Sequence, residues 1–414
     1  MTQSPTATHS AAAAVIGGGP VGLVAALALA HFRVPTALVA APSRPPPAGR
    51  IDNRTTALMA SSVAALAALG VWERCRGAAA PLRALRIADD TGRLWRAPEL
   101  RFAAAEISRE AFGWNIENTH LVAALAARAV EMPELTRIEA AARAIHIDRD
   151  GATAALSDGS SLRCALVVGA DGRDSLCRAT AGIAIATRTL PQTALTFTLR
   201  HDRPHRDIST ELHTAHGPFT LVPLPGLRSS LVCVTTAADA EHLGALSGAA
   251  LDEEIERRAH SILGKMHIEP GRGAFALSVA TASRFAANRI ALVGEAAHQF
   301  PPIGAQGLNL GLRDAVTIAE IAGDIHRAAG DIGGSQATAE YDRRRRGDVI
   351  GRTIAVDLLN RSLLTDFLPM QGARGLGLYL LGHIGPLRRA AMREGVAPSA
   401  ATPALMREEA LLDA

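Results

Sequence analysis

Three glycines near the N-terminus have the spacing of a phosphate-binding turn. Gly17, Gly19 and Gly22 form the pattern GxGxxG. In such a turn the first glycine permits a tight bend, the second lets a pyrophosphate approach the backbone, and the third lets a helix pack closely on the preceding strand. The pattern alone is weak, because glycine turns serve many structural purposes. Its position between a strand-like and a helix-like segment favours an ADP-containing cofactor.

One part of the dinucleotide-binding pattern is missing. Such sites normally carry an acidic residue about 20 residues after the glycines, where it binds the ribose hydroxyls. The corresponding position here is Ala40, and the nearest acid, Asp52, follows a proline-rich stretch. We therefore expect the adenosine end to be bound by backbone groups, water or another side chain.

Two further segments place polar residues directly after strand-like runs. Leu166–Ala170 leads into Asp171–Arg173, and Ile290–Val293 leads into the long segment Gly294–Asp314. Each alone could be a strand that ends in a tight turn. His298, within the second segment, could act as an acid–base, but a histidine at the start of a helix or loop is more often structural.

The elements that must position these residues alternate between strand and helix at the N-terminus. The patterns predict a strand at Ala12–Ile16, a helix at Pro20–His31 and a strand at Thr36–Val39, which make a βαβ unit. Helical spacing resumes at Thr56–Leu69, and Gly70 is placed to cap the end of that helix.

Farther along the chain, alternating and β-branched residues predict an antiparallel sheet, and apolar spacing predicts more helices. The sheet is expected to contain Leu85–Arg96 and much of Thr193–Thr236. The other expected elements are a helix at Leu251–Ile262, a strand at Arg289–Val293, a helix at Gly307–Ile321 and helices from Ile350 onward.

The composition is that of a globular protein with two or three domains. The chain has 414 residues, of which 48% are hydrophobic and 20% charged, and the net charge is +3. So small a charge does not indicate a nucleic-acid partner. The cysteines lie too far apart for a zinc motif or a disulfide framework, which favours a reducing compartment. They are Cys75, Cys164, Cys177 and Cys233.

The sequence predicts a cytoplasmic protein. No apolar run reaches the roughly 18 residues needed to span a bilayer, and the N-terminus lacks the features of a secretory signal. One C-terminal stripe has two interpretations: docking onto the cofactor domain, which is the more common use, or peripheral contact with the inner membrane. The stripe consists of Leu376, Leu380, Ile384 and Leu387, followed by Arg388, Arg389 and Arg393.

The three motif segments, in this order and at these separations, resemble those of the single-component flavin monooxygenases built like p-hydroxybenzoate hydroxylase. Within that group the chain is most similar to the ubiquinone-biosynthesis hydroxylases of the UbiH/UbiF type. The resemblance extends from about residue 12 to 395. It is carried further by Asp52–Leu58, Leu69–Trp72, Glu117–Asn118, Gly217–Pro223, Gly294–Asp314 and Tyr341. Two departures are Ala40 and Glu295, the latter where the family has an aspartate.

The resemblance implies an α/β fold in which a Rossmann-type FAD domain is interleaved with an antiparallel-sheet substrate domain and followed by a C-terminal helical region. We expect the FAD domain at residues 1–80, 98–182 and 272–350. The substrate domain is expected at residues 81–97 and 183–271, and the helical region at 351–414.

The resemblance also implies the chemistry. NADH or NADPH reduces FAD, the reduced flavin and O2 form a C4a-hydroperoxide, and its distal oxygen hydroxylates the aromatic ring of a lipophilic polyprenylated phenol in ubiquinone biosynthesis. The flavin carries the chemistry and the protein supplies position, dryness and electrostatics. Other ubiquinone-biosynthesis proteins are conceivable partners.

Site residues follow from the same resemblance. Next to the reacting centre it implies Pro302, Gly304 and Gln306. For the cofactor it implies Gly17, Gly19, Gly22, Arg54, Asn118, Asp171, Gly172, Arg173, Gly294, Glu295, Gly307, Leu308 and Asn309. For the substrate we expect Phe219, Leu221 and Pro223, which alternate toward one face of a strand and are apolar enough for a prenylated ring.

Two other functions stay open on the sequence alone. One is a flavin-dependent reduction of an isoprenoid substrate; flavin-dependent halogenation fits less well, because Lys265 is the only lysine and the halogenase motif Trp-x-Trp-x-Ile-Pro is missing. The other is a non-catalytic FAD-containing partner in a quinone-synthesis assembly, which Ala40 and Glu295 motivate because both could weaken cofactor binding.

Overall fold

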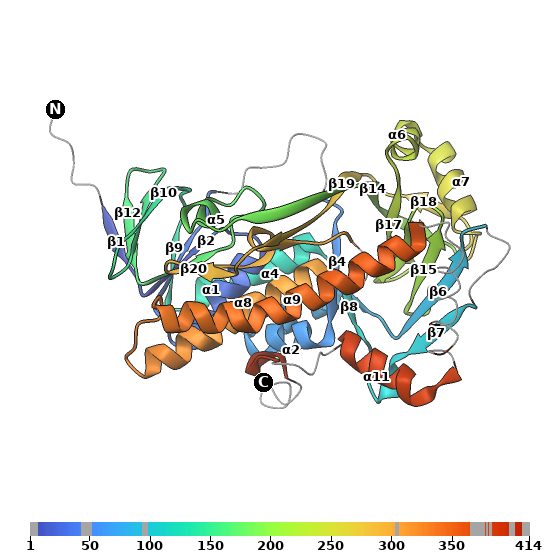
Figure 1. Cartoon of the computed structure of the whole chain (residues 1–414). Helices are drawn as coiled ribbons and strands as arrows, with labels where there is room; N and C mark the ends of the chain where they lie inside the picture. The colour runs from blue at the N-terminus through green and yellow to red at the C-terminus, as the bar shows by residue number, and fades with distance from the viewer. Residues whose placement is uncertain are drawn as a thin grey trace.

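The computed structural model describes residues 7–42, 52–92, 98–302, 306–364, 383–396 and 402–407, together with residues 377 and 380. The chain forms two regions that lie side by side (Figure 1). One region is built around a parallel sheet wrapped by helices. The other is a large, mostly antiparallel sheet with two helices on its outer face.

The parallel sheet forms because its strands are short apolar runs that can be buried on both faces. All four residues of the strand that precedes the glycine turn are buried, and the same is true of its neighbours on either side. The strand order is β20 (Ala286–Ala287), β21 (Ile290–Leu292), β13 (Leu166–Gly169), β2 (Ala13–Ile16), β3 (Thr36–Val39) and β9 (Leu135–Ile138). Apart from the antiparallel pair β20–β21, the pairings are parallel.

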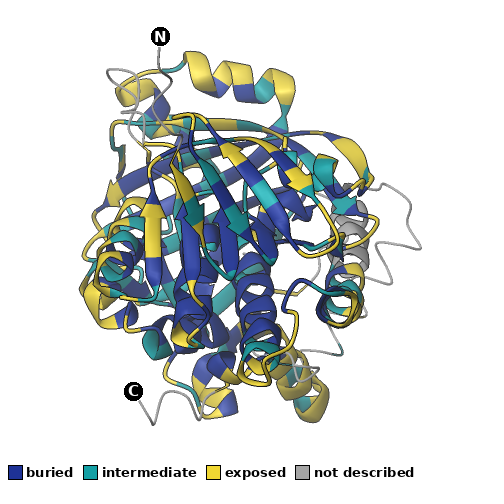
Figure 2. Cartoon of the chain, turned by 90° about the vertical axis from the view of Figure 1, so that its left-hand side faces the viewer, coloured by how far each residue is buried: buried dark blue, intermediate teal, exposed yellow. Residues whose placement is uncertain are grey.

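Helices cover this sheet and form its core. The first of them, α1 (Pro20–His31), is buried from Gly22 to Ala30, as expected for a helix that is apolar all round. It packs on the long helix α8 (Gln306–Arg327) and on α4 (Asn118–Glu131). Figure 2 shows the resulting buried centre in dark blue. The other helical elements are α2 (Ala60–Ala68), α3 (Trp72–Cys75), η1 (Arg76–Ala78), α5 (Leu176–Thr180), η3 (Gly294–Ala296), α9 (Ser335–Leu364) and η4 (Ala404–Met406).

Two small sheets flank the parallel sheet. One has the order β1 (Thr8–Ser10), β12 (Ser161–Cys164), β11 (Ala152–Leu156) and β10 (Ala142–Ile147). The other has the order β4 (Thr55–Met59), β8 (Gly113–Glu117) and β5 (Ala79–Pro81). The second matters for the site, because β4 borders both cavities described below.

The large sheet supplies one wall of the site. Its strand order is β22 (His298–Gln299), β19 (Gly273–Ala282), β14 (Ile185–His201), β17 (Arg228–Thr236), β16 (Pro218–Leu224), β15 (Ile208–Thr214), β6 (Ala84–Asp90) and β7 (Leu100–Ala103), with β18 (Met266–Ile268) beside β14. The helices α6 (Ala237–Ala245) and α7 (Ala249–Arg258) close its outer face over an apolar cluster. Near β7 lie η2 (Ala104–Ile107) and α11 (Gly385–Val396).

The predicted α/β class, the βαβ start and the second sheet are confirmed, whereas some elements differ. Residues 55–59 form strand β4 and only then begin helix α2, because Thr55 and Thr56 are β-branched and pair with β8. The pair β6–β15 is parallel, so the large sheet is mixed. Helix α9 starts at Ser335 and passes through the expected boundary at 350, while β7 and β19 belong to the large sheet. Among the described residues, none of the helices is both long and apolar enough to cross a bilayer.

Candidate functional site

The predicted glycine turn follows β2, and its three glycines meet three different surroundings. Gly17 has φ +119°, and a Cβ there would lie 2.2 Å from the carbonyl oxygen of Ala170. A Cβ on Gly22 would lie 2.0 Å from the carbonyl oxygen of Gly17, so helix α1 can approach the strand only without a side chain. A Cβ on Gly19 would meet no atom within 4 Å. The turn therefore leaves open backbone at the start of α1, which fits a pyrophosphate group.

The position of the missing acid is closely packed. A Cβ on Gly18 would lie 2.6 Å from Cβ of Ala40, which follows β3. The next acid, Asp52, is engaged by its own neighbour, because Arg54 donates two hydrogen bonds of 2.8 Å to its carboxylate. The hydrogen bond from Arg54 lowers the pKa of Asp52. Ala40 is thus packed against the glycine turn, and the carboxylate of Asp52 is already paired with Arg54.

The DG segment is a turn that Asp171 shapes. Its carboxylate accepts hydrogen bonds from Ser175 Oγ at 2.6 Å and from the Cys177 backbone N–H at 3.0 Å, which fixes the start of α5. Gly172 has φ +80°, and a Cβ there would meet nothing within 4 Å. Asp171 thus builds the turn, while Gly172 leaves open space beside it.

The third segment is fixed by close packing. Gly294 has φ +60°, and its backbone N–H donates to Asp314 Oδ2 at 3.0 Å. A Cβ on Gly311 would lie 2.7 Å from Val21 Cγ2, and one on Gly294 would lie 3.2 Å from the same atom. Because β2, β13 and β21 are parallel neighbours, their carboxyl ends bring all three motif turns to one edge of the sheet.

A buried charge network lies behind the third turn. His298 Nε2 lies 2.6 Å from Asp314 Oδ2, and Arg345 Nε lies 2.6 Å from Asp314 Oδ1. Burial raises the pKa of Asp314, but the neighbouring His298 and Arg345 outweigh it and hold the pKa below its usual value. Arg345 also forms an ion pair with Asp348 at 2.6 Å, and Asp348 forms a second ion pair with Arg313 at 3.2 Å. His298 is therefore a structural residue with a buried partner.

Two predicted cofactor residues form hydrogen bonds with strand β4. Asn309, on α8, accepts from the Met59 backbone N–H at 2.9 Å and donates to the Ala57 carbonyl at 2.8 Å. Asn118, at the start of α4, accepts from Thr56 Oγ1 at 2.6 Å. Both side chains thus position the strand that borders the cavities.

A cavity of about 250 Å3 brings several predicted residues together. Arg173 Nε lies 3.2 Å from Glu295 Oε2 at its rim, and both side chains are more than half exposed. The predicted residues that line this cavity are Arg54, Asn118, Arg173, Glu295 and Pro302. Its other wall comes from β14, β17 and β19 of the large sheet.

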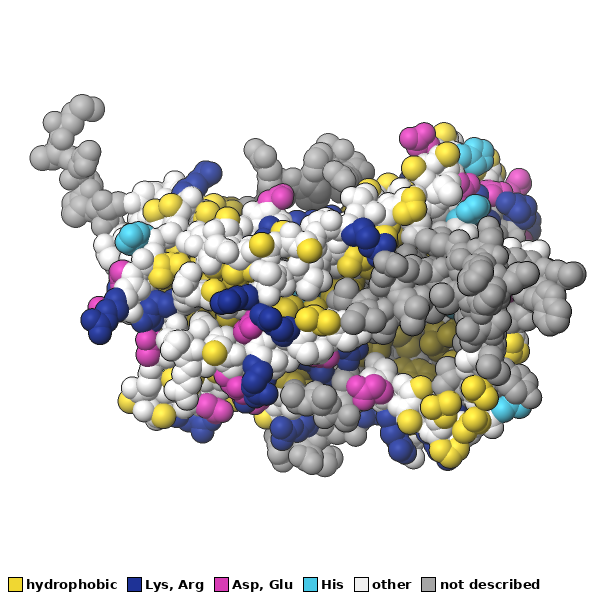
Figure 3. All heavy atoms as spheres, viewed as in Figure 1, with side chains coloured by type: hydrophobic (Ala, Val, Ile, Leu, Met, Phe, Trp, Pro, Cys, Tyr) yellow, Lys and Arg dark blue, Asp and Glu magenta, His cyan; other side chains and the backbone are white. Residues whose placement is uncertain are grey.

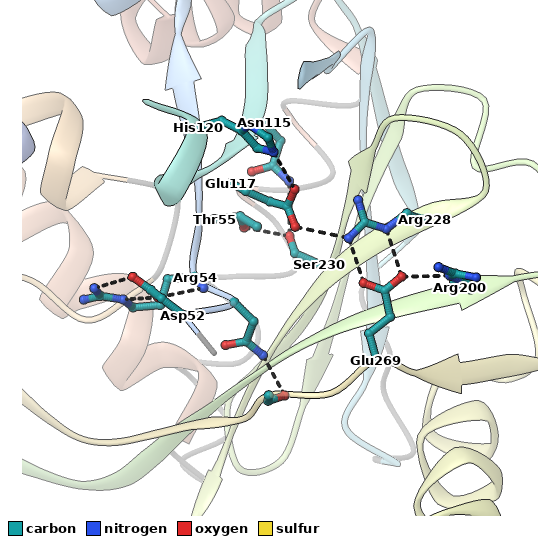
Figure 4. A network of polar contacts seen from close by, with 12 residues as sticks. Asp52, Arg54, Thr55, Asn115, Glu117, His120, Arg200, Arg228, Ser230 and Glu269 are labelled. Carbon is teal, nitrogen blue, oxygen red and sulfur yellow. Dashed lines mark hydrogen bonds and ion pairs between the residues drawn. The ribbon is translucent and has the colours of Figure 1, made fainter. Parts of the chain in front are cut away.

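Polar contacts join the two regions beside this cavity (Figure 4). Arg228 on β17 donates to Glu117 at 3.1 Å and to Glu269 at 2.7 Å. The hydrogen bonds that Arg228 donates to Glu269 and Glu117 raise the pKa of Arg228. Thr55 on β4 donates to Ser230 on β17 at 2.8 Å. The edge of β4 and β8 is therefore fixed against the large sheet.

A larger cavity of about 530 Å3 adjoins the first and shares Thr55, Val232, Phe300 and Pro302 with it. Of the predicted residues, Pro302, Gly307 and Leu308 line it. Its walls are mostly apolar and include Met59, Leu82, Leu85, Phe102, Phe112, Val222 and Met392. Gly304 lies outside the described residues, as does the side chain of Gln306, which begins α8.

The predicted substrate residues Phe219, Leu221 and Pro223 do not line this cavity. Phe219 and Leu221 are buried in the apolar cluster under α6 and α7, on the opposite face of the sheet, and Pro223 is buried and does not line the cavity. Their strand neighbours Thr220 and Val222 line it instead. Successive residues of a strand point to opposite faces, so choosing the more apolar set selected the wrong side.

Sequence reasoning also missed several lining residues. Ser209 and Glu211 on β15 and Asn115 on β8 are polar groups of the larger cavity. Ala391, Met392 and Gly395 of α11 close another side. The alternation within β15 could have indicated that Ser209 and Glu211 share a face, but not which region that face meets.

Comparison with known proteins agrees with this geometry. The family described as FAD binding domain matches residues 10–347. Ubiquinone hydroxylase UbiL of Rhodospirillum rubrum is 36% identical over 92% of this chain and 88% of its own length. The 3-demethoxyubiquinol 3-hydroxylase of Escherichia coli is 31% identical over 95% of this chain and 99% of its own.

Solved structures show the same fold. HpxO of Klebsiella pneumoniae, complexed with FAD, superposes with a TM-score of 0.71 at 20% identity, covering 94% of this chain and 99% of that one. The open backbone at Gly19 and Gly172 and the cavity around Arg54, Arg173 and Glu295 fit that cofactor. The chain therefore belongs to the FAD-binding-domain family, in the group of FAD-dependent aromatic hydroxylases that includes the ubiquinone hydroxylases.

Proposed function

We propose that this chain hydroxylates the aromatic ring of a polyprenylated phenol in ubiquinone biosynthesis, using NADH or NADPH and O2. The observation that carries the proposal is the 530 Å3 cavity, which lies against Pro301, Pro302 and the start of α8 and has mostly apolar walls. Such walls suit a prenylated ring better than a charged benzoate. The names of the relatives, ubiquinone hydroxylase and 3-demethoxyubiquinol 3-hydroxylase, support the same substrate class.

When bound, FAD supplies the redox chemistry and the activation of O2. The residues of this chain then bind and orient the cofactor and the substrate, and they exclude water from the site. Gly17, Gly19 and Gly22 place open backbone and the N-terminus of α1 at the pyrophosphate. The backbone N–H groups at Gly307 and Leu308, in the first turn of α8, can stabilise negative charge beside the larger cavity. Pro302, Gly304 and Gln306 remain our candidates next to the reacting centre.

Turnover under labelled O2 tests the proposal. We expect purified FAD-loaded protein, given NADH or NADPH and a demethoxy or demethyl ubiquinone precursor, to put one labelled oxygen atom into the product. A product that gains hydrogen and no label would instead indicate an isoprenoid reductase. Stopped-flow absorbance separates the remaining alternative, since flavin that stays oxidised even with substrate present indicates a non-catalytic partner.

We also propose that the α11 end of the molecule touches the membrane surface from which a lipophilic substrate would come. Ile384 and Leu387 are 43% and 44% exposed, and Arg389 and Arg393 are exposed beside them. Figure 3 shows hydrophobic side chains gathered at this corner. Leu380 is half-buried, and Leu376 lies outside the described residues.

Vesicle flotation tests this contact. We expect the protein to float with anionic vesicles more than with neutral ones, and Leu387→Glu to reduce flotation. Equal recovery of the wild-type protein and the variant in the pellet would contradict the contact. Association with other ubiquinone-biosynthesis proteins rests on the sequence resemblance alone.

A further inference from the structure

The larger cavity contains one ionisable side chain among its described lining residues, Glu211. Glu211 lies on β15, where it pairs in register with Thr220 of β16, and both face the cavity. Ser209, two residues earlier on the same strand, lines it as well. The carboxylate is therefore built into the sheet wall that a ligand in this cavity would meet.

A buried histidine supports this carboxylate from behind. Nε2 of His213 lies 2.8 Å from Oε1 of Glu211, and the two side chains are 4% and 13% exposed. They lie on the same face of β15, two residues apart. When the carboxylate of Glu211 is ionised it only accepts hydrogen bonds, and Nε2 of His213 is then the donor. Within the described residues His213 is the hydrogen-bonding partner of Glu211, which leaves the carboxylate capacity to accept further hydrogen bonds.

A carboxylate in an apolar cavity costs free energy unless its acceptor capacity is used. No arginine or lysine is among the described residues that line the cavity, so the wall offers Glu211 no cation. The matching ligand group is a hydroxyl that can donate. We propose that Glu211 is a catalytic residue that accepts the hydrogen bond, and then the proton, of the phenolic hydroxyl of the substrate. This inference rests on the proposed function.

The proton transfer balances over the reaction. As the O–O bond of the activated oxygen breaks and the new C–O bond forms, the phenolic O–H bond breaks, its electron pair moves toward the ring, and the proton goes to Glu211. One atom of O2 enters the product and the other leaves as water, with NADH or NADPH as the two-electron reductant of the established FAD chemistry. When the attacked ring carbon then loses its hydrogen as a proton to water, the ring regains aromaticity and the first oxygen takes back the proton from Glu211. His213 positions the carboxylate throughout and is not consumed.

A binding measurement tests the contact without turnover. The ligands are a short-chain prenylated phenol and its methyl ether, titrated calorimetrically into the FAD-loaded protein. We expect the wild type to prefer the phenol by about tenfold or more, because a hydrogen bond to a charged acceptor is lost with the ether. Glu211→Gln should lose most of that preference. An unchanged preference in Glu211→Gln would overturn the proposal.

A matched control comes from another carboxylate–histidine pair of the same domain. Asp252 on α7 lies 3.2 Å from Nδ1 of His267, and α7 covers the outer face of the sheet. We expect Asp252→Asn to keep the wild-type preference for the phenol. Equal loss in both variants would indicate a general effect of removing a carboxylate and would also overturn the proposal.

The pH dependence of hydroxylation separates proton transfer from a structural role. At neutral pH we expect Glu211→Gln to hydroxylate about 100-fold more slowly than wild type, with unchanged FAD content and flavin reduction. The deficit should narrow as the pH rises toward about 10, where a phenol ionises without help. Glu211→Asp should recover part of the rate. If the rate of Glu211→Gln is lower than that of the wild type by the same factor at every pH, Glu211 has only a structural role in the sheet.

The ratio of the hydroxylation rate of Glu211→Gln to that of the wild type isolates the effect of Glu211, because the neighbouring charged groups are present in both proteins. On the cavity face these groups are His213 on β15, Asp89 on β6, which pairs in register with His213, and Arg388 on α11, which lies over Phe102 of the cavity wall. The two proposals fail differently. A wild type that hydroxylates no prenylated phenol refutes the proposed function, whereas a wild type that hydroxylates one equally well as Glu211→Gln refutes only the role of Glu211.

Discussion

Nε2 of His298 lies 2.6 Å from a carboxylate oxygen of Asp314, and the two side chains are 1% and 0% exposed. The same carboxylate accepts from the Gly294 backbone N–H and from Arg345 on α9. One buried charge on α8 therefore joins the third motif turn, strand β22 and the last helix of the cofactor region. The loop that carries Phe300 and Pro302 continues directly from this point into the wall shared by both cavities.

Neutralising Asp314 should destabilise the cofactor region strongly. Asp314→Asn leaves the buried Arg345 without its full counter-charge, and breaking a buried pair in this way costs about 3–5 kcal/mol. Urea unfolding followed by circular dichroism measures the change. Asp324→Asn on the same helix is the control, because its ion pair with Arg327 is exposed and should contribute less than about 1 kcal/mol. Equal effects of the two changes would contradict the central role of Asp314.

The glycine turn allows a matched pair of substitutions. Gly22→Ala places a Cβ 2.0 Å from the Gly17 carbonyl oxygen, so we expect the protein to lose its fold or to accumulate as insoluble material. In Gly19→Ala the added Cβ has no atom within 4 Å, so the free energy of thermal unfolding of the apoprotein should change by less than about 1 kcal/mol. Its FAD affinity should nevertheless fall at least about tenfold, because the methyl group enters the space open to the pyrophosphate. Full FAD affinity in Gly19→Ala would place the pyrophosphate elsewhere.

Strong acid should remove one stabilising ion pair between the outer helices α6 and α7. Arg258 donates two hydrogen bonds of 2.7 Å to Asp239, and this lowers the pKa of Asp239 to about 2. Because the folded pKa lies below the unfolded value near 3.9, the stabilisation is present above about pH 4 and is lost as the pH falls through about 2. The difference in urea midpoint between wild type and Asp239→Asn should therefore close across this range. A difference that persists at pH 2 would contradict the assignment.

Detaching α11 should impair the substrate cavity and spare the cofactor. Arg388 Nε lies 2.6 Å from Glu106, and its guanidinium carbon lies 4.4 Å from the centre of the Phe102 ring. Phe102 and Met392, one helical turn after Arg388, both line the cavity. We expect Arg388→Ala to raise KM for the phenol several-fold and to increase NAD(P)H oxidation without product, at unchanged FAD content. Arg76→Ala removes a surface pair with Glu73 and should leave both values as in wild type.

Local patterns were enough to predict the motif turns. The glycine spacing and the apolar runs before Gly17, Asp171 and Gly294 define short buried strands, and parallel strands place their ends together whatever the rest of the chain does. The grouping of Arg54, Arg173 and Glu295 at one cavity followed from the family resemblance.

The remaining features depend on contacts that are distant in the sequence. Strand β4 forms because it pairs with β8, which begins more than fifty residues later. Without that partner, the sequence of β4 is equally consistent with the start of a helix. One partner of Asp314 on α8 is Arg345, which lies on the next helix, α9. Both faces of β16 are occupied, one by α6 and α7 and one by the cavity, so polarity alone could not assign Phe219 and Thr220 to their sides.

Strand β14 runs unbroken for 17 residues, or about 56 Å, from its pairing with β19 at Ile185 to its pairing with β18 at His201. Its pairing with β19 shifts once, between Thr189 and Thr193. Beyond this shift, Ala194 and Thr196 share one face of β14 and line the smaller cavity. Insertion of one residue after this shift would turn each later side chain of the strand to the opposite face of the sheet. Ala194 and Thr196 would then point toward the outer helices, although neither residue had been replaced.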